Sequence, residues 1–148
     1  MNNNKGFTII ELMAVVSIVS ILAVVAMATY SDYVVRSKVS EGMVFAAEAK
    51  TSVTDYFYNT QRWPKNNRQA GLPEPQDYDK HDYISRLEVS SAVPNGVITV
   101  TFKVEGTNAD RKELQLIPST LEGLVRWTCL PPEENGLDVN QAPPNCRG

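Results

Sequence analysis

Residues 6–31 read GFTIIELMAVVSIVSILAVVAMATYS, and this stretch decides the fold. Leu12 to Ser31 is a run of 20 residues without a charged side chain, and most of them are Val, Ile, Leu, Ala or Met. As an α-helix this run is about 30 Å long, which is enough to cross the hydrocarbon core of a bilayer. The sequence therefore predicts a membrane-inserted helix near the N-terminus.

The helix is expected to continue beyond the apolar run. No proline or glycine lies between Phe7 and Arg36, so nothing stops the helix at residue 31. Apolar side chains then recur on one helical face, at steps of three, four or seven: Val35, Val39, Met43, Ala46, Val53 and Phe57. We expect one helix from Phe7 to about Tyr58, about 78 Å long. Because the stripe is short and drifts, it indicates a face that covers a globular core rather than a soluble coiled coil.

The rest of the chain predicts a loop and a sheet. Residues 59–82 are rich in Asn, Gln, Pro, Gly and Asp, which is typical of a connecting loop with room for a short helical turn. Four strand patterns follow, at residues 83–89, 97–102, 114–117 and 124–128. Their short connections predict an antiparallel meander, with the amphipathic half of the helix on one face. The expected fold class is α+β: a long N-terminal α-helix packed against a four-stranded antiparallel β-sheet, then a C-terminal loop bracketed by cysteines.

The overall composition narrows the classes of protein. With 148 residues there is room for one domain with a modest core and one long appendage. The formal net charge is only −3, which provides no basic face for nucleic acid. The 43% content of apolar residues argues against a disordered chain.

Cys129 and Cys146 are the two cysteines of the chain. An even pair in a protein that leaves the cytoplasm favours a disulfide, and two reduced buried thiols are the alternative. Closing the intervening loop of 16 residues would contribute roughly 3 kcal/mol in the chain-entropy model. A zinc site lacks ligands, because His81 is the one histidine and is distant in sequence.

The sequence predicts no catalytic residues, no metal and no cofactor. His81 lies in the acidic segment 76–82, which is compatible with a calcium site or a positioned base, but a solvated loop explains it more simply. The motif of a nucleophile elbow, a phosphate loop or an HExxH helix does not occur in the sequence. The aromatic residues near the expected helix end are predicted to pack on the core: Tyr56, Phe57, Tyr58 and Trp63.

The N-terminus permits two interpretations. In the first, residues 26–28, Ala-Met-Ala, form a signal-peptidase site, and a secreted soluble binding domain begins at Thr29. Glu11 argues against it, because an ionised side chain in a membrane-inserted segment costs on the order of 3 kcal/mol. Cleavage after Ala28 would also cut a helix whose second half has no start signal of its own.

The second interpretation gives Glu11 a function. A cut between Gly6 and Phe7 would place the new amine of Phe7 four residues before Glu11. An acid in the first turn is favoured by the helix dipole. Within a bundle of such helices, the amine of one subunit would neutralise the glutamate of another. The alternative is that Glu11 simply lies at the level of the lipid headgroups.

The segment Gly6-Phe7-Thr8-Ile9-Ile10-Glu11-Leu12-Met13, followed by the apolar run, resembles the prepilin signature of type IV pilins. Other segments resemble later parts of the type IVa major pilins: 63–64 and 70–72 the loop after the helix, 95–99 the sheet, and 127–129 with 144–147 the disulfide-bracketed region. The resemblance implies a leader at 1–6, a transmembrane or filament-core half-helix at 7–31 and a globular pilin domain at 32–148.

The same resemblance implies a life cycle. A prepilin peptidase would cut after Gly6 and methylate the amine of Phe7 in the inner membrane of a Gram-negative bacterium. An inner-membrane assembly machinery would then build a helical homo-oligomer, an extracellular pilus, in which Glu11 contacts the Phe7 amine of a neighbour. Adhesion, motility or DNA uptake, and host or surface receptors, belong to such filaments. A minor pilin or a type II secretion pseudopilin is the alternative, and the cysteine bracket favours a pilin.

The sequence departs from the family pattern at two positions. Ser20 and Ala28 stand where the family often has glycine and proline, so local melting of the helix in a filament is not predicted from these positions. The loop between the cysteines contains three acids and no Lys or Arg up to residue 145: Glu133, Glu134 and Asp138. We expect this loop to be an exposed acidic patch and the chain to show no strong intrinsic nucleic-acid binding.

Overall fold

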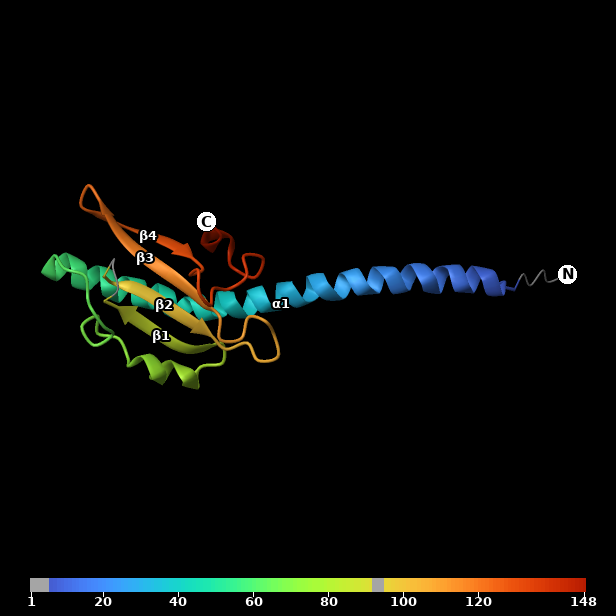
Figure 1. Ribbon diagram of the computed structural model, residues 1–148, viewed down its shortest axis with the longest axis horizontal. Coiled ribbons are helices and arrows are strands. Elements are labelled where there is room, and N and C mark those ends of the chain that lie inside the picture. The colour runs from blue at the N-terminus through green and yellow to red at the C-terminus, as the bar shows by residue number, and fades with distance from the viewer. Residues whose placement is uncertain (1–5, 92–94) are drawn as a thin grey trace. The chain divides into compact units, whose positions relative to one another are not determined.

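A computed structural model of the chain describes residues 6–91 and 95–148, so most of the expected leader, residues 1–5, lies outside the described residues. The elements in chain order are helix α1 (Ile9–Thr60), the 3₁₀ helix η1 (Pro75–Lys80), strands β1 (Ile84–Ser90), β2 (Val97–Phe102), β3 (Glu113–Leu121) and β4 (Leu124–Leu130), and the 3₁₀ helix η2 (Pro144–Cys146) (Figure 1). The chain divides into two compact units, Met1–Tyr33 and Val34–Gly148.

The prediction of a single long helix is confirmed, because α1 runs without a break from Ile9 to Thr60. The hydroxyl groups of its apolar half donate to carbonyl oxygens one turn earlier, from Ser17 to Met13 at 2.8 Å and from Ser20 to Val16 at 2.7 Å. These polar side chains are therefore satisfied within the helix and need no water. At the other end, Gln61 adopts a left-handed conformation (φ 55°) and donates its N–H to the carbonyl of Phe57, which ends α1.

The four strands form one antiparallel sheet in the order β1-β2-β3-β4, as the sequence predicted. The largest difference from the predicted bounds lies in β3, which continues through Pro118 to Leu121 rather than ending at Ile117. β4 also continues two residues further than predicted, to Leu130. A two-residue turn, Glu122-Gly123, has positive φ at both positions (52° and 80°) and joins β3 to β4. Such a turn follows the twist of the two strands, so their pairing extends to its base.

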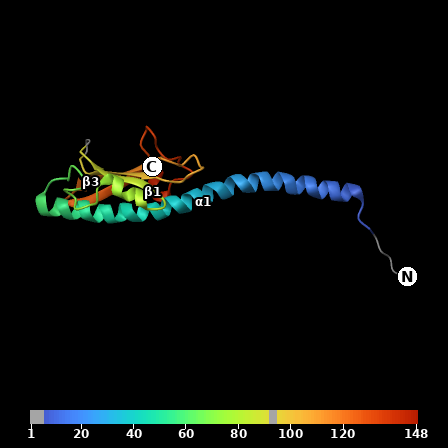
Figure 2. The same ribbon diagram turned by 90° about the horizontal axis from the view of Figure 1, so that it is seen from below.

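The core of unit 2 lies between the inner face of the sheet and the second half of α1, which runs along that face (Figure 2). Val35, Val39, Ala46 and Val53 of the predicted stripe are buried, so this stripe does cover a globular core. Met43 and Phe57 are partly buried. The sheet contributes buried aliphatic and aromatic side chains from its inner face: Ile84, Leu87, Val89, Ile98, Val100, Phe102, Leu114 and Leu116.

A buried asparagine attaches the loop after α1 to the sheet. Asn67 is 2% exposed, and its Nδ2 donates to the carbonyls of Pro73 (2.7 Å) and Leu87 (2.8 Å). Its Oδ1 accepts the N–H of Val89 at 2.7 Å. The side chain thus occupies backbone groups on the outer edge of β1, where a further strand would otherwise pair. The loop itself contains η1, the short helical turn for which the sequence left room.

At Gly42 the helix α1 lies close against the sheet, and this contact generates a test of the packing. A Cβ atom at this position would lie 2.8 Å from Cγ2 of Ile84 and 3.0 Å from Cε1 of Phe102. We expect Gly42→Leu to lower the free energy of unfolding of the detergent-solubilised protein by about 1–3 kcal/mol, because the core is overpacked. Ala47→Leu, at an exposed position of the same helix, is the control and should change it little. Equal effects of the two substitutions in denaturant titrations would contradict this packing.

Candidate assembly and processing site

The start of α1 is closed by a capping interaction between Thr8 and Glu11. The backbone N–H and the hydroxyl of Thr8 both donate to Oε2 of Glu11, at 2.9 Å and 2.6 Å. This is the reciprocal half of a capping box, in which a glutamate three residues into the helix binds back to the residue before it. Sequence reasoning singled out Glu11 but missed Thr8 as its partner, although the spacing Thr-x-x-Glu carried the signal.

Gly6 and Phe7 precede α1 and lie outside regular secondary structure. The side chain of Phe7 is 85% exposed. Among residues 6–91 and 95–148, no atom lies within 4 Å of a Cβ added at Gly6. This part of the chain therefore places no steric demand for glycine at position 6. Any such demand would have to come from an enzyme that reads the site.

Unit 1 presents a long apolar surface. The large aliphatic side chains of α1 before residue 30 are more than half exposed: Ile9, Ile10, Leu12, Met13, Val15, Val16, Ile18, Val19, Ile21, Leu22, Val24, Val25 and Met27. By length and composition, with a mean hydropathy of 2.7 in its most apolar window, α1 is able to cross a membrane. An apolar surface of this extent is stable only when lipid or protein covers it.

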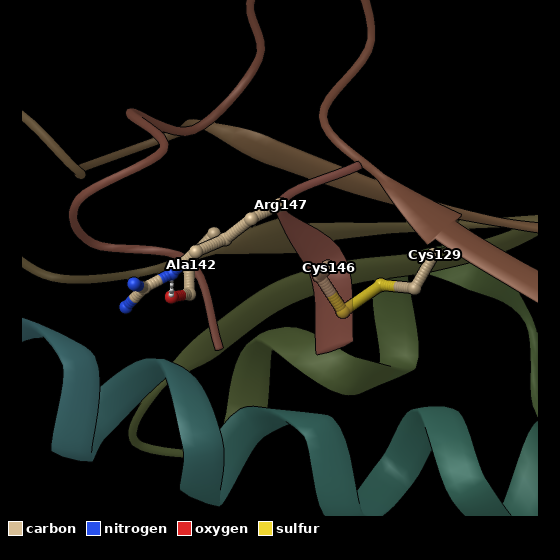
Figure 3. The surroundings of a disulfide bond; sticks show 4 residues. All are labelled: Cys129, Ala142, Cys146 and Arg147. Atoms are coloured by element: carbon tan, nitrogen blue, oxygen red, sulfur yellow. Dashed lines mark hydrogen bonds between the residues drawn. A yellow bond between two sulfur atoms is a disulfide. The ribbon is translucent and has the colours of Figure 1, made fainter. Parts of the chain in front are cut away.

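The predicted disulfide is present. Cys129 near the end of β4 and Cys146 in η2 form a disulfide with their Cα atoms 4.5 Å apart (Figure 3). The alternative of two reduced thiols is therefore wrong. Beside the bond, Nε of Arg147 donates to the carbonyl of Ala142 at 3.1 Å, which closes the last turn of the chain (Figure 3).

The loop between the cysteines is more ordered than a solvated spacer. The N–H of Glu113 donates to the carbonyl of Asn135, and the N–H of Leu137 donates to the carbonyl of Glu113, both at 3.0 Å. Gly136 lies between these bonds, and a Cβ there would clash with the carbonyl oxygen of Pro132. Leu137, Gln141 and Ala142 are buried. The predicted acids are exposed all the same: Glu133, Glu134 and Asp138.

The acidic segment around His81 packs against α1. The ring of His81 lies 4.3 Å from that of Phe45, and Tyr78 meets Phe45 edge-on at 6.1 Å. Burial, together with Glu48 and Asp77, raises the pKa of the Tyr78 phenol above its ordinary value. Within residues 6–91 and 95–148, three side chains able to bind one metal ion do not come together.

The aromatic residues at the end of α1 pack as predicted. Phe57 stacks on Trp63 with ring centroids 4.1 Å apart, and Trp63 meets Trp127 of β4 edge-on at 6.4 Å. Trp63 and Trp127 both pack against the buried core. This cluster therefore attaches the first residues of the loop and the last strand to the helix.

A membrane-competent apolar helix whose second half covers a four-stranded sheet defines a class of membrane-inserted, helix-anchored subunits. Comparison with known proteins makes this class specific. Residues 35–147 match the family described as pilin (bacterial filament), and residues 1–27 match the prokaryotic N-terminal methylation motif. The chain belongs to the type IV pilin family. Its function is therefore that of a structural subunit of a pilus.

Curated relatives agree over most of the chain. The type IV major pilin protein PilE1 of Neisseria gonorrhoeae is 37% identical over 97% of this chain and 93% of the relative. A fimbrial protein of Neisseria meningitidis serogroup A is 42% identical over 84% of this chain and 72% of the relative. The fimbrial protein EcpC of Eikenella corrodens is 37% identical over 97% and 90%. These relatives span the helix and the sheet together.

The disulfide generates a stability prediction. Cys129→Ser is expected to lower the free energy of unfolding by roughly 2–5 kcal/mol, because the unfolded chain regains the freedom of the intervening loop. Denaturant titration of the detergent-solubilised protein measures the change. Wild-type protein treated with a reductant is the matched comparison and should lose a similar amount. If the substitution left stability unchanged, the bond would not be what holds η2 against β4.

Proposed function

We propose that the chain is the major subunit of a type IV pilus, inserted in the inner membrane as a precursor and then packed into an extracellular filament of a Gram-negative bacterium. The observation that carries the proposal is the apolar surface of α1, which starts directly after Phe7 and carries one charged side chain, Glu11, near its head. The chain acts by assembly rather than by catalysis.

The membrane stage uses residues 7–31. Lipid covers their apolar side chains before assembly, and the hydroxyls of Ser17 and Ser20 are already bonded to the helix backbone. In the filament, the same side chains of many copies cover one another. Residues 32–148 form the globular pilin domain, and its surface loops are the parts available to host or surface receptors. Transfer from lipid to a bundle of helices replaces one apolar environment by another, so assembly requires an additional specific interaction.

Processing creates that interaction. A prepilin peptidase cuts between Gly6 and Phe7, and removal of the leader, residues 1–6, gives Phe7 a charged amine, which the enzyme also methylates. The carboxylate of Glu11 is turned toward this end of the helix by its two hydrogen bonds with Thr8. When the inner-membrane assembly machinery adds a subunit, the Phe7 amine of one copy and Glu11 of another neutralise each other. A buried charge is tolerated in an apolar bundle only when it is paired in this way.

Two other functions are weaker on structural grounds. A secreted soluble domain would require cleavage after Ala28, in the interior of the unbroken helix α1. A minor pilin or a type II secretion pseudopilin would share the helix and the sheet. The relatives named as major pilins and the disulfide at the C-terminal region favour the major subunit.

The proposed processing is tested by the mass of the mature chain. We expect filament subunits that begin at Phe7 with a methylated amine. A Gly6→Leu variant should accumulate as a folded, uncut precursor in the membrane, because position 6 is open and the substitution does not disturb the fold. Mature subunits beginning at Met1 or at Thr29, or normal trimming of the Gly6→Leu chain, would contradict the proposal.

The role of Glu11 is tested separately from membrane insertion. Glu11→Gln should insert into the membrane at least as well as wild type, because the apolar segment loses its charge. Filament yield should nonetheless fall several-fold when this variant is the sole subunit, since the Phe7 amine of its neighbour lacks a counter-charge. Membrane fractionation and sheared-filament yield report the two steps. Wild-type piliation by the Glu11→Gln strain would show that the pairing is not needed.

A further inference from the structure

The second half of α1 carries a row of exposed acids. Glu41, Glu48 and Asp55 are exposed and are spaced seven residues apart. Seven residues are nearly two helical turns, so the three carboxylates follow one line along the helix at steps of about 10.5 Å. Across the described residues, none of the three forms an ion pair. We name these three side chains the acidic stripe.

The surface beside the acidic stripe is exposed, and most of its side chains are small. Val44 is 67% exposed, and Ala47 and Thr51 are exposed as well. Small side chains permit another surface to come close to the helix backbone. Lys50, a cation on the same stretch of α1, is directed elsewhere, with its Nζ 5.8 Å from the centroid of the Trp127 ring. The stripe therefore combines uncompensated negative charge with room for a partner.

A cationic hollow lies just after the end of α1. Its volume is about 430 Å³, and six residues line it, without an acid among them: Tyr56, Arg62, Trp63, Lys65, Gln69 and Asn95. Arg62 and Lys65 are exposed, and neither forms an ion pair with any residue in 6–91 or 95–148. Arg68 of the same loop differs, since its guanidinium lies 3.4 Å from the carboxylate of Glu74. We name Arg62 and Lys65 the basic pair.

The segment that carries the basic pair is held in place by its own hydrogen bonds. The N–H of Lys65 donates to Oε1 of Gln69 at 2.8 Å, and the N–H of Gln69 donates to Oδ1 of Asn66 at 2.9 Å. Trp63, between the two cations, is stacked on Phe57. The two positive charges are therefore presented on an ordered scaffold, so that little conformational entropy is lost when they meet a partner.

We propose that the acidic stripe of one copy of this chain binds the basic pair of another copy, as a contact between globular domains in the filament; this inference rests on the proposed function. The two surfaces are complementary in charge and are both left unpaired within one chain. A contact between two different patches of identical subunits is head-to-tail, and it propagates into an open helix unless it closes into a ring. It therefore favours polymerisation and sets the register between neighbouring domains, which the non-directional apolar contact of the helices leaves open.

The first experiment removes the charge of the stripe. The variant Glu41→Gln, Glu48→Gln, Asp55→Asn is compared with the matched control Glu122→Gln, Glu133→Gln, Glu134→Gln, which changes net charge equally at exposed positions elsewhere. We expect at least a threefold loss of sheared filaments for the stripe variant and a wild-type yield for the control. Purified filaments of the stripe variant should dissociate at a lower temperature than wild-type filaments in 50 mM NaCl. This difference in temperature should shrink in 500 mM NaCl, because salt screens exposed charges.

The second experiment exchanges the charges. Glu48→Lys with Asp55→Lys, and separately Arg62→Glu with Lys65→Glu, should each reduce filament yield at least threefold. All four substitutions in one chain should restore at least half of the wild-type yield. Denaturant titration of the solubilised chains checks that each variant folds.

The outcomes separate this inference from the proposed function. If wild-type filaments do not contain this chain, the proposed function fails. If they contain it but the stripe variant assembles like wild type, the inference alone is overturned. The inference is also overturned if the chain with all four substitutions gives a filament yield as low as that of either double variant. That result would assign these charges to another partner, such as the assembly machinery.

Discussion

The structure depends on one constraint in the first half of α1. This half of the helix has an apolar surface that is not stable in water, and the surface carries one carboxylate, Glu11, in its first turn. Lipid or other helices must cover the side chains from Phe7 to Met27, and Glu11 must be neutralised wherever it is buried. Thr8 provides two hydrogen bonds to Glu11 within the chain, but hydrogen bonds do not cancel its charge. The remaining requirement is a cation, and the proposed cleavage before Phe7 would create an amine four residues from Glu11.

The second half of α1 has a different role, because it covers one face of the sheet. Its small buried residues, including Gly42 and Ala46, allow the sheet to pack closely on the helix. Its exposed side carries Glu41, Glu48 and Asp55 together with Val44 and Ala47. One uninterrupted helix thus has an apolar surface in its first half and one buried face in its second half. The globular unit is built on a helix whose first half is long and apolar enough to cross a membrane.

Much of this structure was predictable, because it depends on the spacing of apolar residues. The apolar run, the stripe from Val35 to Phe57 and the alternation in β2 indicated the helix, its buried face and the sheet. The sequence was less informative where one side chain makes a specific contact. The third strand was expected to end at Ile117, yet β3 continues through Pro118 to the turn at Glu122-Gly123. Asn67 resembled any loop residue, and its three bonds to backbone groups depend on a tertiary position that no local pattern records.

Asn67 also bears on a danger that every filament-forming sheet protein faces. A pilus would bring very many copies of one sheet to high local concentration, and a bare strand edge is a template for pairing with the next copy. Asn67 occupies the edge of β1, and at the other side of the sheet the Tyr58 hydroxyl accepts the N–H of Val125 in β4 at 3.3 Å. Each edge strand thus has backbone groups that are already bonded within the chain, and these groups are not open to pairing with a strand of another copy. A polymer held by helix packing differs in this respect from an amyloid, which grows by strand pairing.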